Sequence, residues 1–218
     1  MNNNELAIWY SITRDTWVNY YWFYKSIFKF SYYKINPISS WIQEIYVWAD
    51  ERLNKQELIK LFNTFFCPEL NKKIFESLET NILAWKVSEI HYSIDSHHND
   101  TTFYIYSEDI SYISFLYTEL SKTSFDVPFS FLDIKSYCLK IKKHQSWELY
   151  YSVVYTSKNF DNKKSFKTSF SNNLKTLWLT FFDETILQNN SFFTYEFSVT
   201  CKNTEIENFT LFKFPRYK

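Results

Sequence analysis

The chain has 218 residues, of which 45% are apolar and 22% aromatic, with 24 basic against 24 acidic side chains and no glycine. This apolar content is enough to build a core and excludes a disordered chain. The lack of glycine excludes the Walker A loop, the Rossmann fingerprint, the kinase glycine-rich loop, the G-x-S-x-G elbow and the standard EF-hand loop, because each needs a residue without a Cβ atom. Most familiar nucleotide-binding enzymes and the α/β-hydrolases are thereby disfavoured.

The amino-acid usage also indicates an AT-rich gene, because Gly, Ala, Pro and Arg are scarce while Phe, Tyr, Ile, Asn and Lys are abundant. Without glycine, tight turns must use Asn or Asp, the residues that best tolerate the left-handed region. We therefore expect positive φ angles at Asn99, Asn162, Asn172 and Asn189.

Aromatic side chains dominate the first 50 residues. Residues 6–12 have the pattern of a short buried strand. From about residue 16 to 32, aromatic residues recur at the spacing of an amphipathic helix, although their high β propensity leaves a pair of strands as the alternative. Residues 41–48 then alternate as a strand.

The clearest helical patterns follow. Asn54 and Glu57 form a capping-box-like start to one helix, and Pro68 fits the first turn of a second. Residues 82–95 and 101–107 are expected to form a hairpin, and a third helix is expected after Asp109. This region predicts a helix-containing part of the fold.

After Ser121, period-2 runs predict six strands, at residues 127–142, 147–156, 164–170, 174–182, 192–202 and 205–214. The sequence thus predicts an α+β fold. A helix-containing N-terminal half, with about three to four helices and short strands, would join an antiparallel β-sheet or sandwich in the C-terminal half. No linker separates the halves, so we expect one domain over residues 1–218, with a subdivision into 1–124 and 125–218 as the alternative.

The sequence predicts a cytoplasmic protein without a membrane segment. The first residues carry no basic leader, and no window approaches 18 uncharged apolar residues. Cys67, Cys138 and Cys201 are far apart and show neither a disulfide framework nor zinc-ligand spacing, which favours buried thiols. No cofactor is expected.

Three of the four histidines lie close together, and His91, His97, His98 and Asp95 are weak candidates for a metal site. No helical His pair or Cys partner accompanies them, so a solvated hairpin tip without metal is favoured. His91, His144 and Glu148 are weak candidates for catalysis, because a metal-independent ribonuclease can use a His with a carboxylate or a Lys. The residues permit this chemistry without indicating it.

Charge is distributed unevenly along the chain. Residues 41–109 hold 6 basic and 12 acidic side chains, whereas residues 134–175 hold 9 Lys and 2 acidic side chains. Lysines interleaved with aromatic residues can attract phosphates and stack on unpaired bases. The nucleic-acid-binding candidates are Lys140, Lys142, Lys143, Lys163, Lys164 and Lys167. A sheet edge protected from aggregation by lysine is the alternative.

The acidic segment indicates capture of a partner protein and favours a basic one, because complementary charge speeds association and aromatic residues anchor interfaces. The candidate contacts are Glu57, Glu69, Glu76, Trp41 and Trp48. The leading hypothesis is a non-enzymatic cytosolic protein-binding module, an inhibitor or immunity-type protein that neutralises a toxin or host factor. The alternatives are a nucleic-acid-binding protein or metal-independent ribonuclease using residues 134–175, and a viral or plasmid structural or assembly protein. The oligomeric state is left open.

Overall fold

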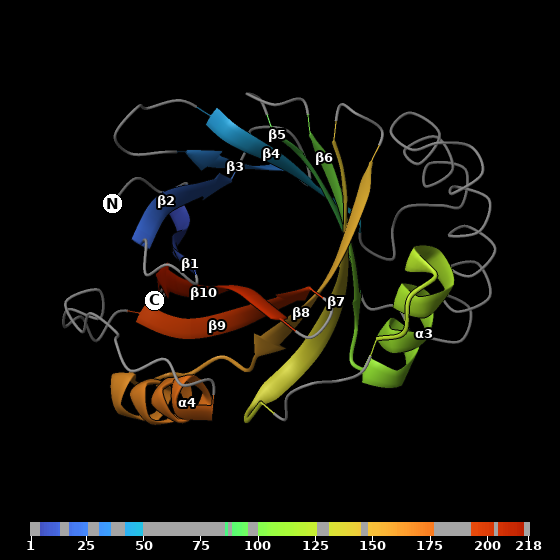
Figure 1. Ribbon diagram of the computed structural model, residues 1–218. Helices are drawn as coiled ribbons and strands as arrows, with labels where there is room; N and C mark the ends of the chain where they lie inside the picture. The colour runs from blue at the N-terminus through green and yellow to red at the C-terminus, as the bar shows by residue number, and fades with distance from the viewer. Residues whose placement is uncertain are drawn as a thin grey trace.

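A computed structural model describes the backbone of residues 5–13, 18–25, 31–35, 42–49, 86, 89–95, 100–125, 131–144, 148–176, 193–202 and 205–215. Side chains are described for residues 86, 93, 100–125, 131–144, 148–173, 194–202, 205–212 and 214. Within these residues, ten strands form a closed antiparallel barrel, and two helices lie on its outside (Figure 1).

Each strand of the barrel pairs with the next along the chain, and the last pairs with the first. The strands are β1 (Glu5–Thr13), β2 (Val18–Lys25), β3 (Ser31–Ile35), β4 (Ile42–Ala49), β5 (Glu89–Asp95), β6 (Thr101–Ser107), β7 (Ile134–Lys143), β8 (Leu149–Ser157), β9 (Phe193–Lys202) and β10 (Glu205–Pro215). The closing pair sets Thr13 of β1 opposite Asn208 of β10 and Ile8 opposite Lys213.

Helix α3 (Ile110–Ser121) connects β6 to β7. The Asp109 carboxylate caps its first turn by accepting hydrogen bonds from the backbone N–H groups of Ser111 and Tyr112, at 2.9 and 3.3 Å. The helix ends at Lys122, which adopts a left-handed conformation with φ 58°. Its buried face, which includes Tyr112 and Leu116, packs against β6, β7 and β8.

Helix α4 (Lys163–Thr176) connects β8 to β9. Asn162 precedes it and accepts a hydrogen bond from the Ser165 N–H at 2.8 Å, which satisfies one of the free donors of the first turn. Phe166 and Phe170 lie four residues apart on one helical face, with ring centroids 5.4 Å apart. Both are buried, and each stabilises the fold by about 1.5–3 kcal/mol through loss of apolar surface from water.

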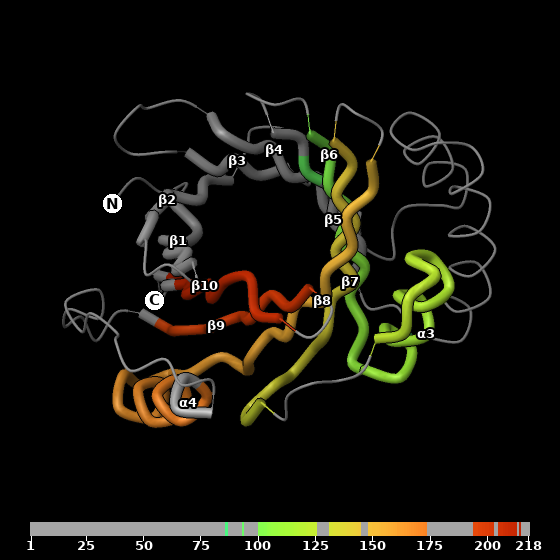
Figure 2. The backbone as a smooth tube through the Cα atoms, in the orientation of Figure 1, coloured from blue at the N-terminus to red at the C-terminus, as the bar shows by residue number. Residues whose placement is uncertain are grey.

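The sheet formed by β6 to β10 has an apolar outer face. Odd-numbered residues such as Phe103, Leu139, Val153, Phe197 and Leu211 are buried in one cluster with side chains of both helices. Figure 2 shows the two helices outside the ring of strands, so the main apolar core of the described residues lies between the barrel wall and the helices.

The inner face of the same strands is predominantly polar. Even-numbered positions of β6 to β9, and those of β10 from Asn208 onward, alternate with the apolar outer residues. Buried hydroxyl groups on this face belong to Ser93, Thr102, Ser152, Ser198, Thr200 and Thr210. Ser93 belongs to this face because it pairs with Thr102. Other inner-face side chains, among them Tyr104, Lys140 and Thr156, remain partly exposed.

The predicted division into a helical N-terminal half and an all-β C-terminal half is wrong. The first half contributes six strands to the same barrel to which the second contributes four. The aromatic segment expected as a helix at residues 16–32 contains β2 and the start of β3, so its strand alternative is correct. Aromatic residues favour a pleated sheet, and this preference prevailed over the helical spacing. The helices predicted from residue 54 to 78 lie outside the described residues.

Other local predictions have mixed outcomes. The structure confirms, within a few residues, the strands predicted at 6–12, 41–48, 147–156, 192–202 and 205–214 and the helix after Asp109. It also confirms the 82–107 hairpin, although only Glu89–Asp95 of its first segment is described as strand. The predicted strand at 127–142 is described as β7 from Ile134. The predicted strand at 164–170 is wrong, because this segment lies in α4. The predicted strand at 174–182 begins in α4, and its later residues lie outside the described part.

The glycine-free turns differ from the prediction. The described residues with positive φ are Lys122 and Asp133, at 58° and 62°. Asn162 and Asn172 do not have it, because Asn162 caps α4 and Asn172 lies within that helix. Asn99 and Asn189 lie outside the described residues.

The cysteine prediction is confirmed where it can be compared. Cys138 and Cys201 are free and buried, and burial raises the pKa of Cys201 to about 12, whereas Cys67 is not among the described residues.

None of the helices in the described part of the chain is long and apolar enough to cross a membrane.

Candidate functional site

Polar side chains gather at one end of the barrel, at the start of β6 and β8 and at the end of β7 and β9. The register places Thr101 opposite Lys143, Lys143 opposite Leu149, and Glu205 opposite Lys202, so these strand ends share one rim. We call the group on the inner side of this rim the barrel-end cluster, and it consists of Asp100, Lys142, His144, Glu148, Tyr150 and Lys202.

Asp100 is the centre of the barrel-end cluster. Its side chain is only 5% exposed, and its Oδ2 atom lies 2.9 Å from Lys142 Nζ and 2.9 Å from His144 Nδ1. Asp100 immediately precedes β6, and the two partners come from the end of the neighbouring β7. One buried carboxylate oxygen thus holds an ammonium group and an imidazole together.

His144 is oriented by this contact and remains accessible, with 38% of its side chain exposed. The Tyr150 ring stands nearly perpendicular to the imidazole, at 88° with centroids 4.8 Å apart. The His144 backbone N–H donates to the Glu148 carbonyl at 3.1 Å, which fixes the base of the hairpin. A carboxylate that accepts a hydrogen bond from Nδ1 leaves Nε2 as the ring nitrogen able to exchange a proton with a ligand.

Tyr150 links the two sides of the cluster. Its hydroxyl donates to Glu148 Oε2 at 2.7 Å, and this hydrogen bond to a carboxylate raises the pKa of Tyr150. Lys202 Nζ lies 4.9 Å from the centroid of the Tyr150 ring, within the range of a cation–π contact. Lys142 beside Asp100 and Lys202 over the Tyr150 ring therefore add two positive charges to the cluster.

This arrangement combines the groups needed for acid–base chemistry on an anionic ligand. Imidazole is the most common general acid or base in enzymes, and the Asp100 carboxylate fixes the orientation of the His144 ring. The ammonium groups can attract a phosphate. In the part of the chain described, no group of three or more His, Cys, Asp or Glu side chains is placed to hold a metal ion.

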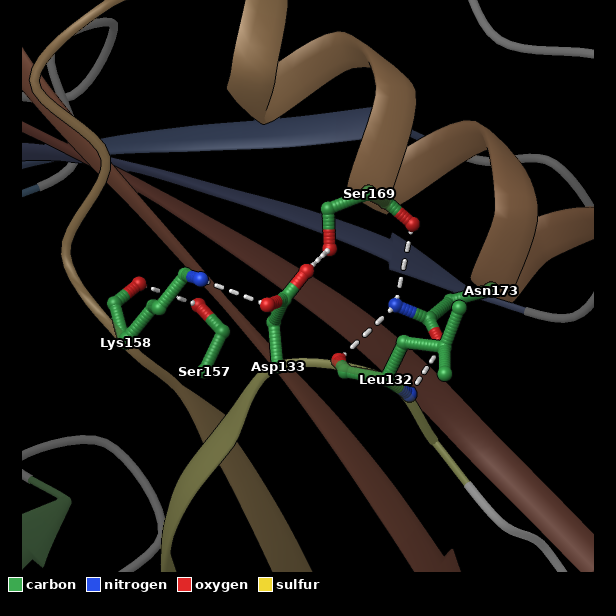
Figure 3. A network of polar contacts seen from close by, with 6 residues as sticks. All are labelled: Leu132, Asp133, Ser157, Lys158, Ser169 and Asn173. Carbon is green, nitrogen blue, oxygen red and sulfur yellow. Dashed lines mark hydrogen bonds and ion pairs between the residues drawn. The ribbon is translucent and has the colours of Figure 1, made fainter.

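A second polar network, which we call the α4 network, connects α4 to the barrel (Figure 3). Asp133 Oδ1 lies 2.6 Å from Lys158 Nζ, and Asp133 Oδ2 accepts a hydrogen bond from the Ser169 hydroxyl at 2.6 Å. The Lys158 hydrogen bond, followed by that of Ser169, holds the pKa of Asp133 below its usual value. The Lys158 backbone N–H also donates to the Asp133 carbonyl at 2.8 Å.

The amide of Asn173 completes the α4 network. Its Oδ1 accepts from the Leu132 N–H at 2.8 Å, and its Nδ2 donates to the carbonyls of Leu132 and Ser169 at 3.3 and 3.0 Å (Figure 3). A cavity of about 660 Å³ opens beside this network, lined in part by Lys158, Asn162 and Lys164. The network joins residues next to β7 and β8 to Ser169 and Asn173 of α4, so it helps to hold α4 in place.

The structure separates the predicted nucleic-acid-binding lysines. Lys140 and Lys142 occupy inner-face positions of β7, and Lys143 occupies the opposite face. Lys163, Lys164 and Lys167 belong to α4, which lies outside the barrel. The basic segment 134–175 is therefore not one continuous surface.

Two predicted catalytic candidates, His144 and Glu148, are brought together in the barrel-end cluster. The third, His91, pairs with Tyr104 in the β5–β6 register, but its side chain is outside those described. Sequence reasoning missed Asp100, Tyr150 and Lys202 as partners of His144. The period-2 pattern across the two hairpins is the signal that could have placed them on one face.

The remaining predicted site residues fall outside the described side chains. Trp48 lies in β4 and Asp95 in β5, of which the backbone is described. The others are Trp41, Glu57, Glu69, Glu76, His97 and His98, and they lie outside the described residues altogether. Their proposed roles in protein binding or metal binding stay predictions.

No model of a known protein family matches the sequence, and no curated protein matches it. The geometry of the barrel-end cluster therefore carries the functional proposal.

Proposed function

We propose that the chain binds single-stranded RNA at the barrel-end cluster and cleaves it by general acid–base catalysis without a metal ion. The supporting observation is the position of His144, whose Nδ1 lies 2.9 Å from the buried Asp100 carboxylate while its ring remains accessible. Lys142 shares that carboxylate oxygen, so a positive charge lies beside the imidazole. Of the functions considered from the sequence, this one uses residues that the structure brings together.

The proposed reaction uses the ribose 2′-hydroxyl of RNA as the nucleophile. His144 Nε2 takes the 2′-hydroxyl proton while the 2′-oxygen attacks the adjacent phosphorus. The bond from phosphorus to the 5′-oxygen breaks, and the departing oxygen takes a proton from water. The products are a 2′,3′-cyclic phosphate and a 5′-hydroxyl, and the imidazolium then gives its proton to the hydroxide that remains.

Three other side chains assist this reaction. Asp100 stabilises the imidazolium and sets the orientation of the ring, as a buried carboxylate does in hydrolase triads. Lys142 and Lys202 attract the phosphate, and their effect weakens as salt screens them. The two buried free thiols, Cys138 and Cys201, support a reducing, cytoplasmic compartment as the place of this activity.

The test is cleavage of a labelled, unstructured RNA by the purified chain in excess EDTA. We expect a product ending in a cyclic phosphate, and a His144→Gln change that lowers the cleavage rate about 100-fold or more, which is within the usual range for loss of a general base. RNA binding by the variant should stay within about threefold, since glutamine keeps a polar side chain and both lysines remain.

DNA of the same sequence provides the chemical control, because it lacks the 2′-hydroxyl. It should bind and remain intact. Absence of RNA cleavage by the wild-type chain, or equal cleavage by His144→Gln, would remove the proposal.

A further inference from the structure

Two side chains of the barrel-end cluster, Glu148 and Tyr150, have no part in the proposed proton transfer. The Tyr150 hydroxyl donates to Glu148 Oε2 at 2.7 Å, and the Tyr150 ring lies beside the His144 imidazole, with centroids 4.8 Å apart. The tyrosine is therefore next to the proposed general base at its ring and next to a carboxylate at its hydroxyl. All three side chains are accessible from outside the protein, His144 to 38% and Tyr150 to 37%.

The Glu148 carboxylate is exposed, and the hydrogen bond from Tyr150 orients it. This bond uses one lone pair of Oε2, and no described side chain hydrogen-bonds to Oε1. A carboxylate has about four lone-pair sites and only accepts hydrogen bonds. Both oxygens can therefore still accept hydrogen bonds from a ligand, and these two acceptors lie side by side.

Guanine is the standard RNA base that matches such a pair of acceptors. Its Watson–Crick edge presents two adjacent donors, the N1–H and the N2 amino group. Adenine and cytosine present one donor beside a ring-nitrogen acceptor, and uracil presents one donor between two acceptors. Because an ionised carboxylate cannot donate, it makes two parallel hydrogen bonds with guanine and at most one with the other bases. Single-stranded RNA exposes this edge to protein side chains.

We infer that Glu148 makes the barrel-end cluster selective for guanosine, so that the chain cleaves RNA on the 3′ side of guanosine residues. This inference rests on the proposed function, because His144 supplies the general base. The base of the nucleotide whose 2′-hydroxyl contacts His144 is the one read. Tyr150 places the carboxylate one tyrosine side chain away from the imidazole, and a nucleoside has a similar length from its 2′-hydroxyl to its Watson–Crick edge.

The deciding experiment maps cleavage of an unstructured RNA in which the four bases are equally frequent, incubated with the purified chain in excess EDTA. We expect cleavage after guanosine about 10-fold faster than after any other base, since a good bidentate contact discriminates bases by about this factor or more. The new 3′ ends should carry guanosine 2′,3′-cyclic phosphate. Equal rates after all four bases, all lost in His144→Gln, would overturn the guanosine inference and leave the proposed function standing.

Base analogues identify the edge that is read. Inosine lacks the N2 amino group, so cleavage after inosine should be about fivefold slower than after guanosine. 7-Deazaguanosine keeps both Watson–Crick donors and loses only the N7 acceptor, so cleavage after it should stay within about twofold of guanosine. A loss with 7-deazaguanosine and none with inosine would show that the opposite edge is read and would overturn the role of Glu148.

Three protein variants test the carboxylate and its orientation. Glu148→Gln replaces one acceptor by a donor, so the ratio of cleavage after guanosine to cleavage after adenosine should fall about 10-fold. Tyr150→Phe removes the hydroxyl that orients the carboxylate and should lower this ratio about threefold. Glu119→Gln removes an exposed carboxylate on α3 and should leave the ratio unchanged. A Glu148→Gln variant that slows cleavage after all four bases equally would overturn the inference.

Binding measures the preference for guanine independently of cleavage. Trinucleotides of 2′-O-methyl nucleotides lack the nucleophile, and those with a central guanine should bind about fivefold more tightly than those with a central adenine. The difference should vanish in Glu148→Gln. Guanine preference in binding without any RNA cleavage would remove the proposed function and keep the inference about guanine. Equal binding of the two trinucleotides would remove that inference.

Discussion

Two aspartates, each placed just before a strand, hold a lysine in this molecule, and their surroundings give them different roles. Asp133 precedes β7 and contacts Lys158 and Ser169 at 2.6 Å, whereas Asp100 precedes β6 and contacts Lys142 and His144 at 2.9 Å. The serine hydroxyl only donates a hydrogen bond to its carboxylate, whereas an imidazole is a side chain that serves as a general base. The third partner, rather than the Asp–Lys pair, therefore distinguishes a structural contact from a site able to do chemistry.

The two aspartates and their partners also differ in how exposed their side chains are. In the α4 network Ser169 is buried, whereas the side chains of Asp133 and Lys158 are 31% and 56% exposed. In the barrel-end cluster the carboxylate is buried while the imidazole remains accessible to a ligand. The comparison teaches that a buried acid with an accessible base is the arrangement to look for in a chain that has no recognisable motif.

The largest expected effect comes from removing the charge of each aspartate in turn. Asp100→Asn should lower RNA cleavage about 100-fold, because an amide can hold the imidazole in the wrong tautomer and cannot stabilise its charged form. Asp133→Asn should leave cleavage within about twofold of wild type. The measurement is the initial rate with labelled RNA, and equal losses in both variants would contradict the division of roles.

For the free energy of unfolding, we expect the larger effect from changes at Asp133 and not from changes at Asp100. Asp133→Ala should lower the free energy of unfolding by about 2–4 kcal/mol, because it removes two hydrogen bonds to a charged group and places a Cβ-bearing residue without polar contacts in the left-handed region. Ser169→Ala should lower it by about 1–2 kcal/mol, since only one of those bonds is lost. Urea unfolding measures both, and a neutral Asp133→Ala variant would show that the α4 network does not stabilise the fold.

Acid should weaken the Asp133 contact in a predictable direction. Lys158 and Ser169 hold the pKa of Asp133 below the usual 3.8. A carboxyl with a lower pKa in the folded state contributes stability above the unfolded pKa and loses it as the pH falls through the folded pKa. The stability difference between wild type and Asp133→Asn should therefore shrink as the pH is lowered from 6 to 3. A difference that stays constant over this range would contradict the ionic contribution.

The smallest expected effect separates backbone strain from side-chain contacts. Lys122 and Asp133 both have positive φ, but the Lys122 side chain makes an exposed ion pair with Glu119 at 3.7 Å, and its backbone N–H bond to Thr118 survives a change to glycine. Lys122→Gly should raise the free energy of unfolding by about 0.5–1 kcal/mol, because glycine relieves the left-handed strain and an exposed pair contributes little. Asp133→Gly gains the same relief and should still be destabilising. Thermal unfolding of the two variants tests this, and a stabilising Asp133→Gly would show that strain outweighs the contacts.

Local features of the fold could be predicted from the sequence, but the closed arrangement could not. The helix after Asp109 was predictable because a capping aspartate precedes a helical apolar pattern. The segment 164–170 was misassigned because Phe166 and Phe170 are four residues apart, a spacing compatible with both a strand and a helix. Barrel closure was not predictable, since the pairing of β1 with β10 joins opposite ends of the barrel sequence and leaves no local pattern.

The candidate site could also be predicted only in part, because it depends on strand pairing between distant segments. His144 and Glu148 were identified from residue type and proximity in the sequence. Asp100 falls in the connection of the hairpin predicted from residues 82–95 and 101–107, and its position beside His144 depends on the β6–β7 register. A shift of two residues would preserve the alternating pattern and break this contact, so alternation alone cannot set the register.

The β1–β10 seam also determines when the protein can fold. Ile8 pairs with Lys213, so this contact joins segments at nearly the greatest sequence separation in the described chain. Such distant pairing makes folding slow, and during synthesis β1 must wait on the ribosome until the tenth strand has emerged. Until then one side of β1 is an unpaired edge, open to another nascent chain.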